Sequence, residues 1–139
     1  MIKDIIKLIR VKHWIKNLLI YATMFLSMQI TGVNIYKLTI GFISFCLISS
    51  VVYIVNDIVD KEKDAKHEIK KDRPIASGRI STKFAIVLAV SFFVIAMILN
   101  YFINGFDYKL YAILLGYLVL NLAYSFKLKN VVLIDVCCI

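Results

Sequence analysis

Residues 38–56 read LTIGFISFCLISSVVYIVN, nineteen consecutive residues without a charged side chain. A helix of about 20 apolar residues crosses the ~30 Å hydrocarbon core of a bilayer. Three further stretches, 18–36, 84–106 and 110–126, also carry no charge. Because all four runs are continuous rather than alternating, they favour membrane-spanning helices over the strands of a barrel.

The composition of the whole chain supports this interpretation. The 139 residues are 61% hydrophobic, with a mean hydropathy of +0.83, which does not suit a single soluble domain. We therefore predict an all-α integral membrane protein, a helix bundle forming one domain over residues 1–139. The predicted spans are about 15–36, 38–57, 84–106 and 110–127, with the start of a fifth at 130–139.

The basic residues are unevenly distributed between the predicted loops. Fifteen of the seventeen Lys and Arg residues lie before the first span, between spans two and three, or after span four, and two lie in the other connections. The positive-inside rule then predicts a multi-pass protein of the cell membrane, with a cytoplasmic N-terminus and a cytoplasmic loop 57–83. The net charge of +8 fits this topology and attraction to anionic lipid headgroups, so we do not expect a nucleic-acid partner.

Loop 57–83 opens with an acidic segment, NDIVDKEKD, at residues 56–64. On a helix continuing from the second span, Asp57, Asp60 and Asp64 would fall within an arc of roughly 60°. Three like charges on one face repel one another unless a cation lies between them, and carboxylate oxygens suit Mg²⁺. The alternative is a solvated helix with alternating Asp and Lys, but Asp57 ends an apolar span, where an ionised group usually marks function.

A basic turn follows the acidic segment. Arg73 can bind phosphate with its planar guanidinium, the segment 74–78 can turn tightly with exposed backbone N–H groups, and Ser81 is a candidate N-cap for the third span. An acidic Mg²⁺ face beside a basic turn, at the mouth of a membrane bundle, suggests that a diphosphate or a phosphorylated sugar is brought to a lipid.

These residues resemble a known family. Residues 56–64 match the NDxxDxxxD motif of the UbiA superfamily of intramembrane prenyltransferases, and DRPIASGR at 72–79 resembles the RPxxSG stretch that follows it. Within the superfamily, RVKHWIKN at 10–17 and AYSFKLK at 123–129 are similar to segments of the decaprenyl-phosphate phosphoribosyltransferase branch. The chain departs from the branch at Val11 and His13, and Leu128 stands where the wider YxxxK spacing has Lys.

The resemblance implies Mg²⁺-dependent transfer of 5-phosphoribose from phosphoribosyl diphosphate to a polyprenyl phosphate, for cell-wall biosynthesis. The residues implied to bind Mg²⁺ and diphosphate, as catalytic and metal ligands, are Asp57, Asp60 and Asp64. The residues implied to bind substrate are Lys16, Asn56, Lys70, Arg73, Arg79, Tyr124, Lys127 and Lys129.

Two alternatives remain open on the residues alone. The same acidic face would serve transfer of a prenyl group from a polyprenyl diphosphate to an aromatic acceptor, or the chain could be a non-catalytic helper subunit or remnant. Members of the resembled family are longer and carry a second acidic motif in a further half. We therefore expect this chain to be an N-terminal half that is inactive without a C-terminal half.

Overall fold

A computed structural model of the chain describes residues 1–26, 31–105 and 108–126, and every regular element within these ranges is a helix. This confirms the predicted all-α class for the described part of the chain. The elements are α1 (Ile2–Ile9), the 3-10 helix η1 (Val11–Leu18), α2 (Leu19–Leu26), α3 (Gly32–Val59), α4 (Lys61–Ala65), the 3-10 helix η2 (Lys70–Asp72), α5 (Thr82–Asn104) and α6 (Tyr108–Phe126).

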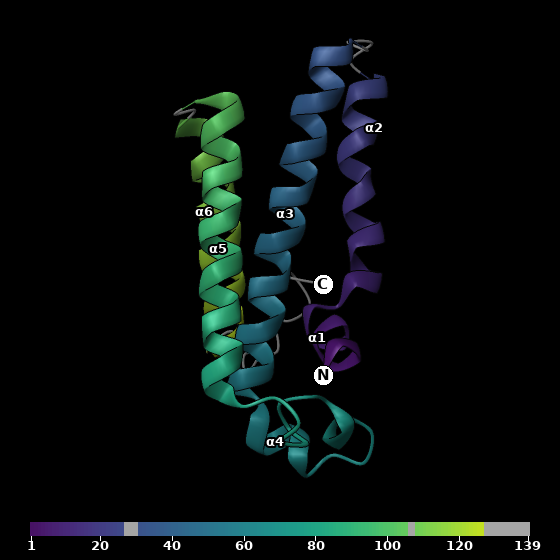
Figure 1. The fold of residues 1–139 in the computed structure, drawn as a ribbon, viewed down its shortest axis with the longest axis vertical. Coiled ribbons are helices and arrows are strands. Elements are labelled where there is room, and N and C mark those ends of the chain that lie inside the picture. Colours follow the sequence, from purple (N-terminus) through teal and green to yellow (C-terminus); the bar gives the residue numbers. More distant parts are fainter. Residues whose placement is uncertain (27–30, 106–107, 127–139) are drawn as a thin grey trace.

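Helix α3 is the centre of the bundle. In Figure 1 it stands between α2 on one side and α5 and α6 on the other. Its most extensive contact is with α5, where Val51 and Ile54 of α3 belong to the same buried cluster as Ala85 and Ala89 of α5. Small residues one helical turn apart let two helix backbones approach closely, which is the usual way that helices associate in a membrane.

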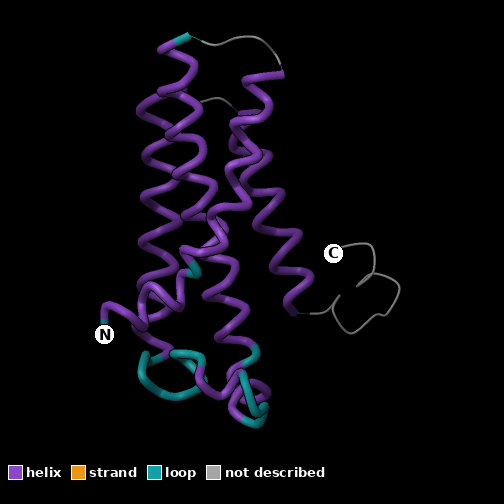
Figure 2. The backbone as a smooth tube through the Cα atoms, turned by 90° about the vertical axis from the view of Figure 1, so that its right-hand side faces the viewer, coloured by secondary structure: helices purple, strands orange, loops and turns teal. Residues whose placement is uncertain are grey.

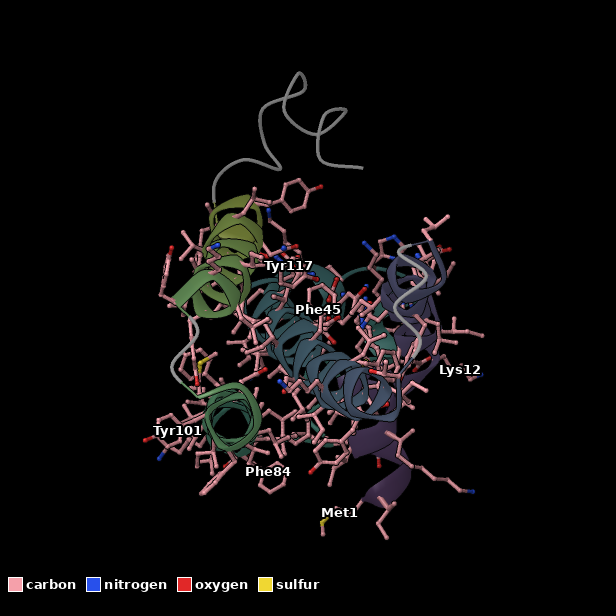
Figure 3. All side chains as sticks on the ribbon, turned by 90° about the horizontal axis from the view of Figure 1, so that it is seen from above. Met1, Lys12, Phe45, Phe84, Tyr101 and Tyr117 are labelled. Atoms are coloured by element: carbon pink, nitrogen blue, oxygen red, sulfur yellow. The ribbon has the colours of Figure 1, made fainter. Side chains whose placement is uncertain are left out.

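Helix α6 completes the bundle through a second cluster. Ile48 of α3 packs there with Ala96 of α5 and Leu114 of α6. The rings of Phe45 and Tyr117 are tilted against each other across the α3–α6 contact, with 4.8 Å between their centroids, and Figure 3 labels both residues between the two helices. The outer faces of α5 and α6 expose large apolar side chains, which is the pattern of helices that contact lipid.

Three helices are long and apolar enough to cross a membrane: Ile35–Val59, Thr82–Phe102 and Tyr108–Phe126. They correspond to the second, third and fourth predicted spans. Of the first predicted span, residues up to 18 belong to η1, 19–26 form α2, and 32–36 are already the start of α3, while 27–30 lie outside the described residues. The four-span count is therefore not confirmed, and the predicted fifth run at 130–139 also lies outside the described part.

The loop between α3 and α5 lies at the same end of the bundle as the N-terminus, as Figure 2 shows. The Ser81 Oγ accepts a hydrogen bond from the Phe84 backbone N–H at 3.2 Å, which confirms Ser81 as the N-cap of α5. The predicted tight turn is also present: the Ser77 N–H donates to the Arg73 carbonyl at 2.9 Å, and Gly78 takes a φ of 76°, which glycine adopts at little cost.

One sequence prediction about this loop is wrong. The helix does not run unbroken through residues 56–64, because α3 ends at Val59 and α4 begins at Lys61. Asp60 lies at the break with φ −88° and ψ 4°. The backbone of Asp60 still bonds to both sides of the break: its N–H donates to the Asn56 carbonyl at 2.9 Å, and its carbonyl accepts from the Asp64 N–H at 2.8 Å.

Candidate functional site

The segment 10–17 is docked along one face of α3 by side-chain hydrogen bonds. Their acceptors on α3, at positions 46, 50 and 57, are spaced by whole helical turns and so share a face. Each bond comes from a residue of the RVKHWIKN stretch. The three bonds are Arg10 Nη2 to Asp57 Oδ1 at 2.7 Å, Trp14 Nε1 to Ser50 Oγ at 3.1 Å, and Asn17 Nδ2 to Cys46 Sγ at 3.3 Å.

Arg10 connects α1 to η1 in a left-handed conformation, with φ 53° and ψ 48°. A side chain with a Cβ is strained in this region by roughly 1–2 kcal/mol. The conformation accompanies two contacts of the guanidinium, which bonds to Asp57 and lies 4.6 Å from the centroid of the Tyr53 ring. A cation above an aromatic face is held there by the ring quadrupole, so Arg10 is fixed from two directions.

Two of the predicted acidic residues are brought together by one arginine. Arg73 Nη1 lies 3.1 Å from Asp57 Oδ1 and 2.6 Å from Asp64 Oδ2. Both carboxylates are buried, and the Asp57 side chain is only 3% exposed. Buried carboxylates need a cationic partner to remain ionised, and here Asp57 has two, Arg10 and Arg73.

The donor set of this pair suits a hard divalent cation. Mg²⁺ usually takes one or two protein carboxylates and completes its shell with water and substrate phosphates, so Asp57 and Asp64 fit it as a pair. The guanidinium of Arg73 holds the position between them in this structure. Among the described residues, no group of three or more His, Cys, Asp or Glu side chains is placed to hold a metal, so the third predicted ligand, Asp60, does not join the pair.

A cavity of about 730 Å³ opens beside the carboxylate pair. Its lining includes Asp57, Arg73 and Pro74 from α3 and the loop, and the other lining residues come from α1, η1 and the connection between them. Most of its polar lining is cationic. The residues that α1, η1 and their connection contribute are Lys3, Ile6, Lys7, Arg10, Val11, Lys12 and His13.

Two polar contacts attach α1 to the loop beneath it. Lys7 Nζ donates to the Asp72 carbonyl at 3.0 Å, and Arg79 Nε donates to Asp4 Oδ1 at 2.8 Å. The hydrogen bond from Arg79, together with the N-terminal amine, lowers the pKa of Asp4. Arg79 thus fixes one wall of the cavity without lining it.

The imidazole of His13 lies among cations. Partial burial, followed by the positive charges of Arg10 and Lys16, lowers the pKa of His13 from its ordinary value of 6.5. Its ring also contacts Tyr53 edge to face, 5.4 Å between centroids. At neutral pH His13 therefore adds a neutral donor or acceptor to the cavity wall, rather than another charge.

The structure brings together only part of the predicted site. Asp57, Asp64 and Arg73 form one cluster. Lys16 and Lys70 are exposed and do not line the cavity, and Asn56 and Tyr124 are half-buried on α3 and α6. Lys127 and Lys129 lie outside the described residues.

Sequence reasoning missed the contribution of α1. In the sequence the basic residues before the first span indicate only topology, yet four of them line the cavity: Lys3, Lys7, Arg10 and Lys12. Arg10 stood at the head of the recognised RVKHWIKN stretch, which was the available signal. Its left-handed backbone, which orients α1 over the loop, has no signature in the sequence.

The chain is similar in sequence to known proteins over most of its length. The model of the UbiA prenyltransferase family matches residues 18–139. The chain belongs to this family. An uncharacterized protein, y4nM, of Sinorhizobium fredii is 37% identical over 97% of the chain and 26% of its own length.

Relatives with named activities cover the same region. Decaprenyl-phosphate phosphoribosyltransferase of Mycolicibacterium smegmatis is 31% identical over 99% of the chain and 44% of the relative. The enzyme of that name from Corynebacterium glutamicum is 33% identical over 94% of the chain and 40% of the relative. The chain thus spans less than half the length of these relatives, and it matches proteins that are named as transferases.

Proposed function

We propose that this UbiA-family chain forms the diphosphate-binding part of a membrane transferase that moves 5-phosphoribose from phosphoribosyl diphosphate to a polyprenyl phosphate. The observation that carries the proposal is the cluster of Asp57, Asp64 and Arg73 beside a cationic cavity, at one end of an apolar bundle. The named phosphoribosyltransferase relatives favour this donor and acceptor.

The placement of the cluster suits a water-soluble donor and a lipid acceptor. Asp57 lies near the end of α3, and Asp64 and Arg73 lie in the loop beyond it, so the charged groups gather at the end of the bundle. Three apolar helices extend from that end. We propose that this end faces the cytoplasm, as the distribution of basic residues predicts, and that the lipid phosphate reaches it from the bilayer.

The site would lower the barrier to transfer mainly by stabilising the charge that develops in the transition state. When the bond from the anomeric carbon to diphosphate breaks, negative charge grows on the leaving group and the ribose becomes oxocarbenium-like. Mg²⁺ held by Asp57 and Asp64 would neutralise part of that charge. Arg73 lies within reach of the same position and can donate to a phosphate oxygen, and such preorganised donors lower the barrier most where charge develops.

The acceptor needs little activation by the protein. A polyprenyl phosphate is already anionic, so its oxygen can attack the anomeric carbon without a strong general base. The protein's task is then to hold the two substrates in line and to shield the reacting carbon from water. Proximity of this kind supplies a large share of the rate in bimolecular transfers.

The test is a transfer assay on the protein purified from its own membrane, with any partner that co-purifies. Radiolabelled phosphoribosyl diphosphate and decaprenyl phosphate are supplied with and without Mg²⁺, and the lipid fraction is counted. Label should enter the lipid only with Mg²⁺ present. The proposal is wrong if the protein transfers a prenyl group but transfers no labelled phosphoribose to the lipid.

A second candidate is prenyl transfer from a polyprenyl diphosphate to an aromatic acceptor. Protoheme IX farnesyltransferase of Leptospira biflexa, which is 34% identical over 63% of the chain and 32% of the relative, favours it. Adding unlabelled farnesyl diphosphate to the transfer assay separates the two functions. Under the first proposal the rate of phosphoribosyl transfer should stay nearly unchanged. Under the second the farnesyl diphosphate should be consumed as a donor.

A further inference from the structure

The cavity is lined by more cationic side chains than are needed to neutralise the carboxylates beside it. Five cationic side chains line it, and Asp57 is the one carboxylate among the lining residues. Asp57 is already bonded to both Arg10 and Arg73. Lys7 bonds to the neutral carbonyl of Asp72, which leaves its charge uncompensated. The side of the cavity formed by α1 and η1 therefore carries a net positive charge.

The backbone at Arg10 gives this side a fixed shape. The left-handed conformation turns the chain sharply between α1 and η1, so that Lys3 and Lys7 of α1 and Lys12 of η1 all border one cavity. Arg10 is held by Asp57 and Tyr53, and α1 is attached to the loop through Asp4 and Arg79. Cations fixed before a ligand arrives bind an anion with less loss of entropy.

We propose that this cavity is a phosphate-monoester site, which adjoins the carboxylate pair that would hold Mg²⁺ and diphosphate and shares Asp57 with it. Lys3, Lys7 and Lys12 attract the doubly charged phosphate, and Arg10 supplies the N–H groups that orient it. The choice of ligand rests on the proposed function. In that reaction two groups are phosphate monoesters, the headgroup of the polyprenyl phosphate and the 5-phosphate of the donor.

The surroundings of the cavity are compatible with both sources. Ile6 lines it, and Ile2 at the start of the same helix and Met1 before it are largely exposed, as in a helix that lies at a membrane surface. A lipid headgroup could enter along that apolar side. The 5-phosphate of a sugar could enter from water and leave the rest of the donor beside Asp57.

The experiment measures equilibrium binding without Mg²⁺ and without diphosphate, by calorimetry on the detergent-solubilised protein. Farnesyl monophosphate and ribose 5-phosphate are the two probes, with farnesol and ribose as their phosphate-free counterparts. At least one phosphate probe should bind more tightly than its counterpart. The probe that does so identifies the source of the phosphate.

The double variant Lys3→Gln with Lys12→Gln removes two charges from the cavity rim. Both side chains are exposed, so the fold should survive, which a thermal melt checks. Each substitution should weaken phosphate binding at least about fivefold, which is the effect of one unit charge on another at about 4 Å in water, because the phosphate carries up to two charges. The matched control is Lys61→Gln with Lys63→Gln, which changes the net charge equally on α4, away from the cavity lining.

The outcomes separate this inference from the proposed function. The site is supported if the phosphate probe binds more tightly than its counterpart, and if Lys3→Gln with Lys12→Gln weakens this binding whereas Lys61→Gln with Lys63→Gln does not. This support does not depend on whether transfer is observed. If neither phosphate binds better than its counterpart, or if both double variants weaken binding equally, the site is wrong. Such a result leaves the transfer assay, which depends on Asp57 and Asp64, unaffected.

Discussion

The guanidinium of Arg73 lies 2.6 Å from the carboxylate of Asp64, and the same Nη1 atom also reaches Asp57 at 3.1 Å. One arginine in the loop thus joins the end of α3 to α4, across the break at Asp60. The position that a divalent cation would occupy between two carboxylates is held by a side chain of the protein itself.

Removing the Arg73 cation should destabilise the fold. Arg73→Gln leaves Asp64 without its cation and Asp57 with Arg10 alone, and breaking a buried ion pair costs about 3–5 kcal/mol. Because Arg73 is partly exposed, we expect about 3 kcal/mol or less in a denaturant titration. Arg73→Gln combined with Asp64→Asn should cost less than the sum of the single variants, whereas simple additivity would show that the two side chains are not coupled.

Mg²⁺ should stabilise the Arg73→Gln variant more than the original protein. In the variant, the two carboxylates have lost the cation between them, so added Mg²⁺ can bind without displacing a guanidinium, and binding to the folded state raises the melting temperature. Melts with and without Mg²⁺ measure the difference. Equal shifts for both proteins would indicate that the Asp57–Asp64 pair is not a metal site.

Replacing Asp57 should abolish most of any transferase activity. Asp57→Asn keeps the shape of the side chain and removes its charge, and we expect the rate to fall at least ~10²-fold, as for the loss of one electrostatic contact at a reacting centre. Glu62→Gln on α4 makes the same chemical change at an exposed position and should leave the rate unchanged. Near-normal turnover by Asp57→Asn would show that Asp57 has no part in the transfer reaction.

The left-handed conformation at Arg10 predicts an unusual order of stabilities. Arg10→Ala and Arg10→Gly both lose the contacts to Asp57 and Tyr53, but only glycine adopts φ 53° without strain. The glycine variant should therefore be more stable, by about 1 kcal/mol. At Lys63, inside α4, the order should reverse, because glycine is the poorer helix former. Alanine and glycine variants at both positions, unfolded side by side, test this.

The contact between Asp4 and Arg79 should depend on pH. Arg79 lowers the pKa of Asp4 below its ordinary value of 3.8 in the folded state, so the contact stabilises the fold fully above that value. The contribution is lost as the pH falls through the lower folded pKa. Selective labelling of the aspartate carboxyl carbons allows NMR titration of Asp4. The pKa should return towards 3.8 in Arg79→Gln, and an unchanged pKa would show that the contact does not form in solution.

The apolar runs were sufficient to locate three helices, because a long continuous apolar stretch satisfies its backbone in a bilayer as a helix, whereas barrel strands are short and alternate. The predicted spans agree with α3, α5 and α6 to within a few residues at most of the ends that the structure describes. The first span was less predictable. Residues 11–18 adopt a 3-10 helix that docks on α3 through Trp14 and Asn17, a contact between segments about thirty residues apart.

What the sequence alone determined is the membrane class, the family and the two motifs that contain Asp57, Asp64 and Arg73, since these depend on local composition and spacing. The tertiary structure decided which charges meet. It placed Arg73 between two carboxylates, left Asp60 out of that pair, and brought α1 over the loop through Arg10. Such choices depend on one left-handed residue and on contacts across 47 and 75 positions of the chain, and no local pattern specifies them.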